Sequence, residues 1–204
     1  MRIISGKMKG FNLHLPKNKN TRPLKDLAKE SIFNLLLHSK KINFDIKNSS
    51  VLDLYAGTGS FGLECLSRDS KSVFFIEQGK EAIEILKKNI DKLNVNKFIK
   101  ILSGDVFSLI KIKKNYKFKF DLIFCDPPFK NSNIEELCKL IINNKLLSNK
   151  GVMVIHRHKN ASDNLNNLLE IVDEKIYGIS KIVFVKLLLK IILFVSALIL
   201  STAG

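Results

Sequence analysis

Val51-Leu-Asp-Leu-Tyr-Ala-Gly-Thr-Gly-Ser-Phe-Gly62 is the stretch from which the fold of this 204-residue chain can be predicted. An apolar run of strand length leads into three glycines spaced as G-x-G-x-x-G, and a helical apolar pattern follows. Glycines at such a turn allow a tight connection and close approach of a ligand to the backbone. The stretch therefore predicts the first strand–loop–helix unit of a doubly wound α/β domain.

From this unit onward, short apolar runs alternate with amphipathic stretches. The predicted strands are 51–55, 73–77, 98–102, 120–125 and 152–156, and the predicted helices are 61–68, 80–93, 106–111 and 134–143. Such alternation is typical of a Rossmann-like, mostly parallel sheet covered on both faces. Two last runs, 170–176 and 182–187, flank Tyr177-Gly178-Ile179-Ser180 and predict an antiparallel strand pair at one edge.

The N-terminal region has a different pattern. Residues 2–15 alternate around Gly6 and Gly10, which predicts a short hairpin, and Thr21-Arg22-Pro23 opens a helix. The apolar residues expected on one side of this helix are Leu24, Leu27, Ala28, Ile32, Phe33, Leu35 and Leu36. We expect three parts, namely a basic hairpin–helix extension (1–47), the main domain (48–186) and a hydrophobic tail (187–204).

Basic residues are concentrated near the N-terminus. The net charge is +15, and the first 47 residues hold 11 Lys or Arg against three acids. A surplus placed in this way favours a polyanionic partner such as nucleic acid. The residues expected to contact phosphates are Arg2, Lys7, Arg22, Lys25 and Lys29. A lysine-rich composition typical of an AT-rich genome is the alternative explanation.

The cysteines and the C-terminal tail bear on redox environment, metal binding and membrane contact. Three cysteines, at positions 65, 125 and 138, lack the spacing of a disulfide framework or a zinc site and predict reduced core residues in a cytoplasmic protein. No His/Cys/acid cluster suggests a metal. The uninterrupted apolar run 191–200 is half of the roughly 20 residues that a membrane span needs. Membrane contact by the tail stays open but is not favoured.

Acidic residues lie at or near the ends of three successive predicted strands. Asp53 stands four residues before Gly57, where a carboxylate would repel a pyrophosphate but suits the ammonium and sulfonium of S-adenosylmethionine (SAM). Glu77 can accept both ribose hydroxyls of an adenosine, as in NAD sites. Asp105 can accept the adenine amino group or cap a helix, and Asp53 can also merely fix its turn. The predicted cofactor is SAM, with Tyr55, Gly59 and Val106 as further contacts.

Asp126-Pro127-Pro128-Phe129 ends the fourth predicted strand. The prolines fix φ and remove two amide donors, which leaves a rigid edge of acceptors. Hydrogen bonds from an amino group to Asp126 and to the Pro127 carbonyl would aim its lone pair, and Phe129 could stack on a base at about 1–3 kcal/mol. The motif therefore predicts methylation of an amino group on a flat base, with a rigid turn as the alternative. Cys125 is expected in the core.

The chain resembles the bacterial guanine-N2-methyltransferases of small-subunit (16S) ribosomal RNA, the RsmD family, over roughly residues 1 to 186. The matching motifs are Met1-Arg2-Ile3-Ile4-Ser5-Gly6-Lys7, Thr21-Arg22-Pro23, Lys29-Glu30-Ser31-Ile32-Phe33-Asn34, Leu52-Asp-Leu-Tyr-Ala-Gly-Thr-Gly-Ser-Phe-Gly-Leu-Glu64 and Asp126-Pro-Pro-Phe129. The resemblance implies a class I SAM-dependent methyltransferase fold and SAM contacts at Asp53, Gly57, Glu77 and Asp105. It also implies methylation of one guanine N2 of 16S rRNA, within an assembled or assembling small subunit. Separately, we expect the protein to be a monomer.

Two positions depart from the family pattern. Leu24 stands where Thr is usual, and His156 stands where an acid is common; neither is expected to touch the catalytic residues. For His156-Arg157-His158, phosphate contact and solvated surface are both open. The alternative functions are an adenine-N6 methyltransferase acting on DNA or RNA, a catalytically idle RNA-binding assembly factor and an NAD-binding oxidoreductase.

Overall fold

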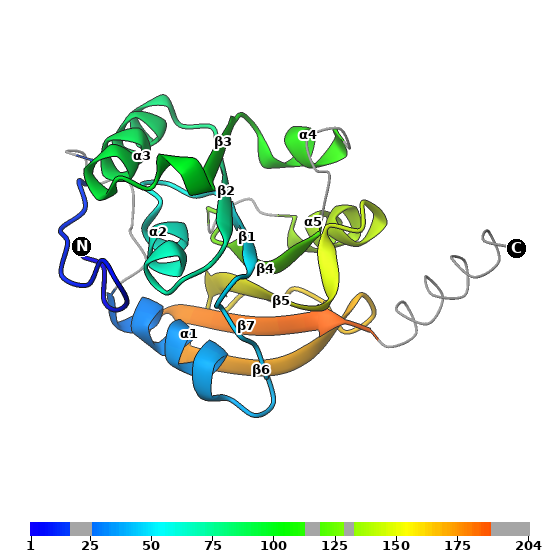
Figure 1. The fold of residues 1–204 in the computed structure, drawn as a ribbon. Coiled ribbons are helices and arrows are strands. Elements are labelled where there is room, and N and C mark those ends of the chain that lie inside the picture. Colours follow the sequence, from blue (N-terminus) through cyan, green and yellow to red (C-terminus); the bar gives the residue numbers. More distant parts are fainter. Residues whose placement is uncertain (17–25, 113–118, 129–132, 189–204) are drawn as a thin grey trace, which may run out of the picture.

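The computed structural model describes residues 1–16, 26–112, 119–128 and 133–188, which form a seven-stranded sheet with helices on both faces (Figure 1). The strands are β1 (Ser50–Leu54), β2 (Ser72–Glu77), β3 (Ile99–Ser103), β4 (Phe120–Cys125), β5 (Leu147–His158), β6 (Leu169–Tyr177) and β7 (Ser180–Leu187). The helices are α1 (Asp26–His38), α2 (Ser60–Ser67), α3 (Lys80–Leu93), α4 (Val106–Lys111) and α5 (Ile134–Asn143), with a 3-10 turn η1 (Asn96–Phe98).

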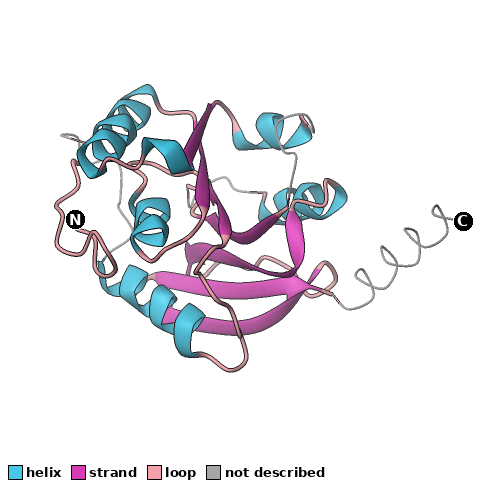
Figure 2. Cartoon of the chain, viewed as in Figure 1, coloured by secondary structure: helices cyan, strands magenta, loops and turns pink. Residues whose placement is uncertain are grey.

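The strand order is β3-β2-β1-β4-β5-β7-β6. β1 to β5 pair in parallel, β7 pairs antiparallel with β5, and β6 pairs antiparallel with β7. The predicted fold, a mostly parallel doubly wound sheet with an antiparallel addition at one edge, is confirmed (Figure 2). The order reverses between β1 and β4, which is where ligands bind in sheets of this kind.

Each face of the sheet carries its own apolar core, because side chains of the inner strands alternate between the two faces. In β4, Leu122 and Phe124 pack on one side, with α1, α2 and α3, while Ile123 and Cys125 pack on the other, with α4 and α5. All three cysteines are buried and free, as predicted. Burial on both faces explains why the central strands are nearly continuous apolar runs.

The N-terminal segment packs into the first of these cores. Ile3 and Leu13 are buried there, and the predicted hairpin is reduced to one antiparallel bridge between Arg2 and Asn12. The prediction that Leu27 faces the core is wrong, since this side chain is 70% exposed. The buried stripe of α1 instead follows the helical repeat through Ala28, Ile32, Phe33 and Leu36.

The predicted tail 187–204 lies outside the described residues from position 189 onward, as does Leu24. Among the helices that the structure describes, none combines the length and apolar character required to cross a membrane.

Candidate active site

The glycine loop joins β1 to α2 at the carboxyl edge of the sheet. Tyr55, Gly57 and Gly59 all have positive φ, of 58°, 57° and 80°. A Cβ added at Gly57 would meet nothing within 4 Å, whereas one at Gly59 would lie 2.3 Å from Leu86 Cδ1. Gly59 therefore allows close packing of the loop on α3, and Gly57 leaves open space in which a ligand can approach the backbone.

The three predicted acids lie at the ends of β1, β2 and β3 and hold backbone amides. Gly62 N donates to Asp53 Oδ2 at 3.0 Å. Glu77 accepts from Gly57 N at 2.7 Å and from Gly79 N at 2.8 Å. The Asp105 side chain caps α4. Two of the alternative roles, the fixed turn for Asp53 and the helix cap for Asp105, are thus present in the structure, and neither excludes a ligand contact.

Main-chain hydrogen bonds tie the loops at this edge together. Ala56 N donates to Ile76 O at 3.0 Å, and Gly104 N donates to Glu77 O at 2.9 Å. The first bond links the β1 and β2 ends, and the second links the β2 and β3 ends. The acids are therefore carried by one connected backbone frame rather than by independent loops.

The electrostatics of the site favour a positively charged ligand. Burial raises the pKa of Asp53 well above its usual value; the hydrogen bond from Gly62 opposes the shift, and the charges of Asp126 and Glu77 add to it. Burial also raises the pKa of Tyr55, with further contributions from Cys125 and Asp105. A cation beside these carboxylates would offset their mutual repulsion. The donor set therefore suits the sulfonium and ammonium of SAM, and no group of His, Cys, Asp and Glu within the described ranges could hold a metal ion.

The Asp126-Pro127-Pro128 segment leaves β4 beside the glycine loop. Asp126 N donates to Leu54 O at 3.4 Å, Pro127 is buried and Pro128 is exposed. The Asp126 side chain is 23% exposed and so remains accessible from outside. Phe129 lies outside the described residues. An acceptor group at the edge of the cofactor-facing loops can orient an amine that approaches from solvent.

His156 contacts Asp126 directly. Its Nδ1 lies 2.7 Å from Asp126 Oδ1, so the expectation that His156 does not touch the catalytic residues is wrong. His156 and Arg157 are 6% and 7% exposed, which also contradicts both sequence-based roles for them, as phosphate contacts or solvated surface. The contact between His156 and Asp126 follows from the strand register. Cys125 lies opposite Ile155, and the next residues along the chain are Asp126 and His156.

The predicted RNA-binding residues separate into different environments. Arg2 and Lys7 are exposed, while Arg22 and Lys25 lie outside the described residues. Lys29 is fully buried, so its assignment to phosphate contact is wrong. Its Nζ donates to Arg2 O at 2.9 Å and to Ser60 Oγ at 3.0 Å, and lies 3.7 Å from Glu64 Oε2.

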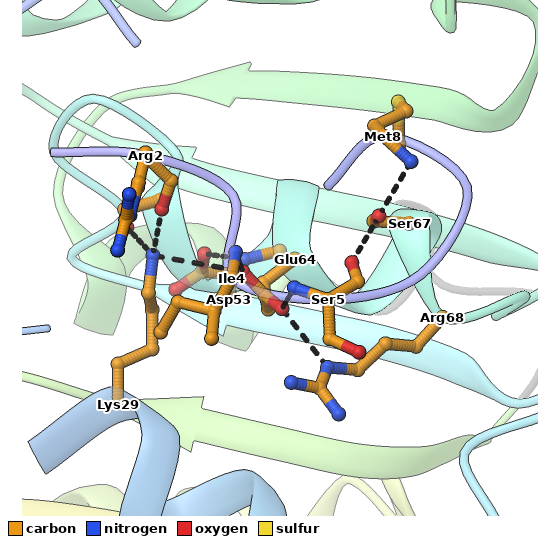
Figure 3. A network of polar contacts seen from close by, with 11 residues as sticks. Arg2, Ile4, Ser5, Met8, Lys29, Asp53, Glu64, Ser67 and Arg68 are labelled. Carbon is orange, nitrogen blue, oxygen red and sulfur yellow. Dashed lines mark hydrogen bonds and ion pairs between the residues drawn. The ribbon is translucent and has the colours of Figure 1, made fainter. Parts of the chain in front are cut away.

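Glu64 anchors the N-terminal segment on α2 (Figure 3). Its buried carboxylate accepts from Ile4 N at 2.7 Å, Ser5 N at 2.9 Å and Arg68 Nε at 3.0 Å. Lys29 thus belongs to a buried polar network that connects α1, α2 and the first residues of the chain. Sequence reasoning missed this role because Lys29 and Glu64 lie far apart along the chain.

Comparisons with known proteins agree with this geometry. "Ribosomal RNA small subunit methyltransferase D" of Buchnera aphidicola is 34% identical over 83% of this chain and 80% of its own length. The solved structure of yhhF from Escherichia coli is 26% identical, covers 92% of this chain and 97% of that one, and has a TM-score of 0.78. SMU.776, solved with S-adenosylhomocysteine (SAH), shares only the fold, at 16% identity over 76% of this chain and 49% of that one, with a TM-score of 0.57.

Fold and site together define a class I SAM-dependent methyltransferase. Residues 1–186 match the sequence model of the family described as "Conserved hypothetical protein 95", and the chain belongs to that family, which includes the RsmD enzymes. The predicted family is therefore confirmed.

Proposed function

We propose that this protein transfers the methyl group of SAM to the exocyclic N2 of a guanine in small-subunit ribosomal RNA. One observation carries the proposal: Asp126, directly after β4, donates its amide to Leu54 O at 3.4 Å and so leaves the sheet beside Asp53, the residue before Leu54 in β1. An acceptor for an amine and acids for a cationic cofactor thus share one edge of the sheet. The name of the Buchnera relative supports ribosomal RNA as the substrate.

The cofactor half of the site would use the strand-end acids. Glu77 would accept the ribose hydroxyls, Asp105 the adenine amino group beside the Val106 amide, and Asp53 would face the ammonium. Tyr55, Gly57 and Gly59 form the loop along which the cofactor would lie. When bound, SAM supplies a methyl group made electrophilic by the sulfonium charge. The backbone amides that hold Glu77 keep its carboxylate oriented for this role.

The substrate half would use the motif after β4. An exocyclic amino group is a poor nucleophile because its lone pair is delocalised into the base. Hydrogen bonds to Asp126 and to the Pro127 carbonyl would hold the nitrogen close to tetrahedral and aim the lone pair, so that transfer needs mainly orientation. Asp126 can accept the amine proton. Stacking by Phe129 stays a prediction.

The RNA would meet the basic N-terminal part of the chain. Arg2 and Lys7 are exposed on the segment that docks on α2, and Arg22 and Lys25 remain candidates. We place the enzyme in the cytoplasm, as a monomer acting on the small subunit or an assembly intermediate. Neutralising Arg2 and Lys7 should weaken RNA binding and flatten its salt dependence, because fewer counterions are released. An unchanged slope would assign these charges to composition bias.

Transfer of tritiated methyl from SAM tests the chemistry. Small-subunit particles, naked ribosomal RNA and DNA are offered in parallel, and the methylated nucleoside is identified. N2-methylguanosine supports the proposal, N6-methyladenine replaces it with the alternative enzyme, and RNA binding without transfer indicates an assembly factor. Asp126→Ala should abolish transfer and leave SAM binding intact. Asp91→Ala, at an exposed position of α3, is the matched control.

A further inference from the structure

His156 and Asp126 are brought together by the register of two interior strands. β4 and β5 run in parallel with Cys125 opposite Ile155, so Asp126 and His156 leave the sheet side by side at its carboxyl edge. The distance of 2.7 Å between His156 Nδ1 and Asp126 Oδ1 is that of a short hydrogen bond between a ring nitrogen and a carboxylate. Their side chains are 8% and 23% exposed, so the contact is partly shielded from water.

The backbones on both sides of this contact are fixed. Asp126 N donates to the neighbouring β1 at Leu54 O, and two prolines follow it. His156 pairs with Ile182 of β7 on the other side of β5. The next residue, Arg157, is held by Asp163 through hydrogen bonds of 2.7 and 3.1 Å. Because neither main chain can shift easily, the imidazole sets the rotation of the Asp126 carboxylate.

A carboxylate has two oxygens, and the histidine holds one of them. In the part of the chain that the structure describes, the Asp126 side chain has no other hydrogen bond than the one at Oδ1. Oδ2 is therefore the atom left to accept a hydrogen bond from a substrate. The exposure of Asp126, greater than that of His156, agrees with an outward-facing oxygen.

We propose, resting on the function proposed above, that His156 is a positioning residue for methyl transfer. Its Nδ1–H donates to Asp126 Oδ1 and turns Oδ2 toward the substrate amine. The amine nitrogen uses its lone pair to form the new N–C bond while the methyl–sulfur bond breaks with its electrons left on sulfur. One amine proton then passes to Oδ2 and later to water, while His156 keeps its own proton and its bond to Oδ1.

This arrangement requires one tautomer of the imidazole. The hydrogen bond that a histidine makes decides which ring nitrogen carries the proton. Nitrogen-15 NMR should therefore show protonated Nδ1 on His156 at a pH where the ring is neutral, and Asp126→Ala should remove that preference. This readout does not depend on methyl transfer. Protonation at Nε2 alone in the wild-type protein would overturn the proposal.

The kinetic test compares two replacements of His156 in the full chain. An asparagine can place its amide nitrogen near the position of Nδ1, whereas leucine has similar size and no donor. His156→Leu should lower kcat for RNA methylation roughly 10- to 100-fold, the cost of a misplaced reacting group. The Kd for SAM and the KM for RNA should stay within about twofold, and His156→Asn should recover most of the loss.

A second histidine of β5 supplies the matched control. His158 lies two residues further along the strand, where its Nδ1 accepts from Asn160 N at 3.2 Å. His158→Leu should keep the wild-type kcat. Wild-type kcat in His156→Leu, or equal losses in the Leu and Asn variants, would overturn the positioning role. Absence of transfer in the wild-type protein would instead contradict the proposed function. The NMR measurement would still test the orientation of His156 toward Asp126, because it does not depend on methyl transfer.

Discussion

The backbone amide of Gly57 donates to the carboxylate of Glu77 at 2.7 Å, across the ends of two neighbouring strands. The same carboxylate accepts from Gln78 N at 2.9 Å and Gly79 N at 2.8 Å. Glu77 therefore holds both the glycine loop and the residues that lead into α3 in place. A residue proposed to bind the ribose also holds the loop along which the rest of the cofactor would lie.

Glu77→Ala should weaken SAM binding by more than the loss of one ligand contact, because the loop loses its anchor as well. We expect at least a tenfold rise in Kd, which corresponds to about 1.4 kcal/mol, measured by isothermal titration calorimetry. Glu84→Ala, at an exposed position of α3, should leave Kd unchanged. Equal affinities for the wild type and Glu77→Ala would remove Glu77 from the cofactor site.

Asp53→Asn should stabilise the ligand-free protein at neutral pH. The pKa of Asp53 is raised in the folded state, so its contribution to stability is present below its ordinary value of 3.8 and is lost as pH rises through the folded-state value. Asparagine avoids that loss and can still accept from Gly62. Urea unfolding at several pH values should show that the variant's free energy of unfolding exceeds that of the wild type by an amount that grows with pH. The variant should also bind SAM more weakly. A wild-type protein more stable than the variant at neutral pH would contradict this account.

Lys29→Met should destabilise the fold rather than weaken RNA binding. The substitution leaves Glu64 buried with Arg68 as its remaining charged partner, and breaking a buried pair costs about 3 kcal/mol or more. Chemical denaturation measures the loss. Lys7→Met, which removes a pair between exposed side chains, should cost less than about 1 kcal/mol. Similar losses in both variants would show that the buried network adds little.

Gly6→Ala should release the N-terminal segment from α2. Gly6 has a φ of 82°, and an added Cβ would lie 1.8 Å from the carbonyl oxygen of Ser67. Gly10, with a φ of 87° and open space around it, supplies the control. Gly10→Ala should cost about 1–2 kcal/mol from the left-handed backbone alone, and Gly6→Ala should cost more. Hydrogen exchange should speed up at the amides of Lys7 and Met8, which donate to Ser67, only in the Gly6 variant.

Local signals in the sequence are sufficient for the main elements. The predicted bounds of β4, α3, α4 and α5 match the structure, because their apolar patterns end at residues that cap helices or break strands. Asp105 caps α4 and Asn133 caps α5 through their side chains. β5 is longer than predicted, since the polar stretch before Val152 still pairs with β4 through an irregular register at Phe120.

Contacts between distant segments could not be predicted in the same way. The buried role of Lys29 depends on Glu64, and a helical pattern alone shows only that a lysine is present. The contact of His156 with Asp126 follows from the pairing of β4 with β5, so it becomes predictable only when strand order and register are known. The site acids were found because each lies within two residues of the carboxyl end of its strand, which is a local feature.

The position of β7 between β5 and β6 bears on how the nascent chain folds. β7 is the last strand in the sequence, but in the sheet it lies between β5 and β6 and pairs with both. Its pairing with β5 includes His156, which lies opposite Ile182. Chains emerge N-terminus first during synthesis. Until residues 180–187 leave the ribosome, β5 therefore has an open edge that can pair with a foreign strand. The pairing of β7 thus completes the sheet and fixes the main chain at His156 together, so a chain stalled before β7 would be aggregation-prone and would lack that support for His156.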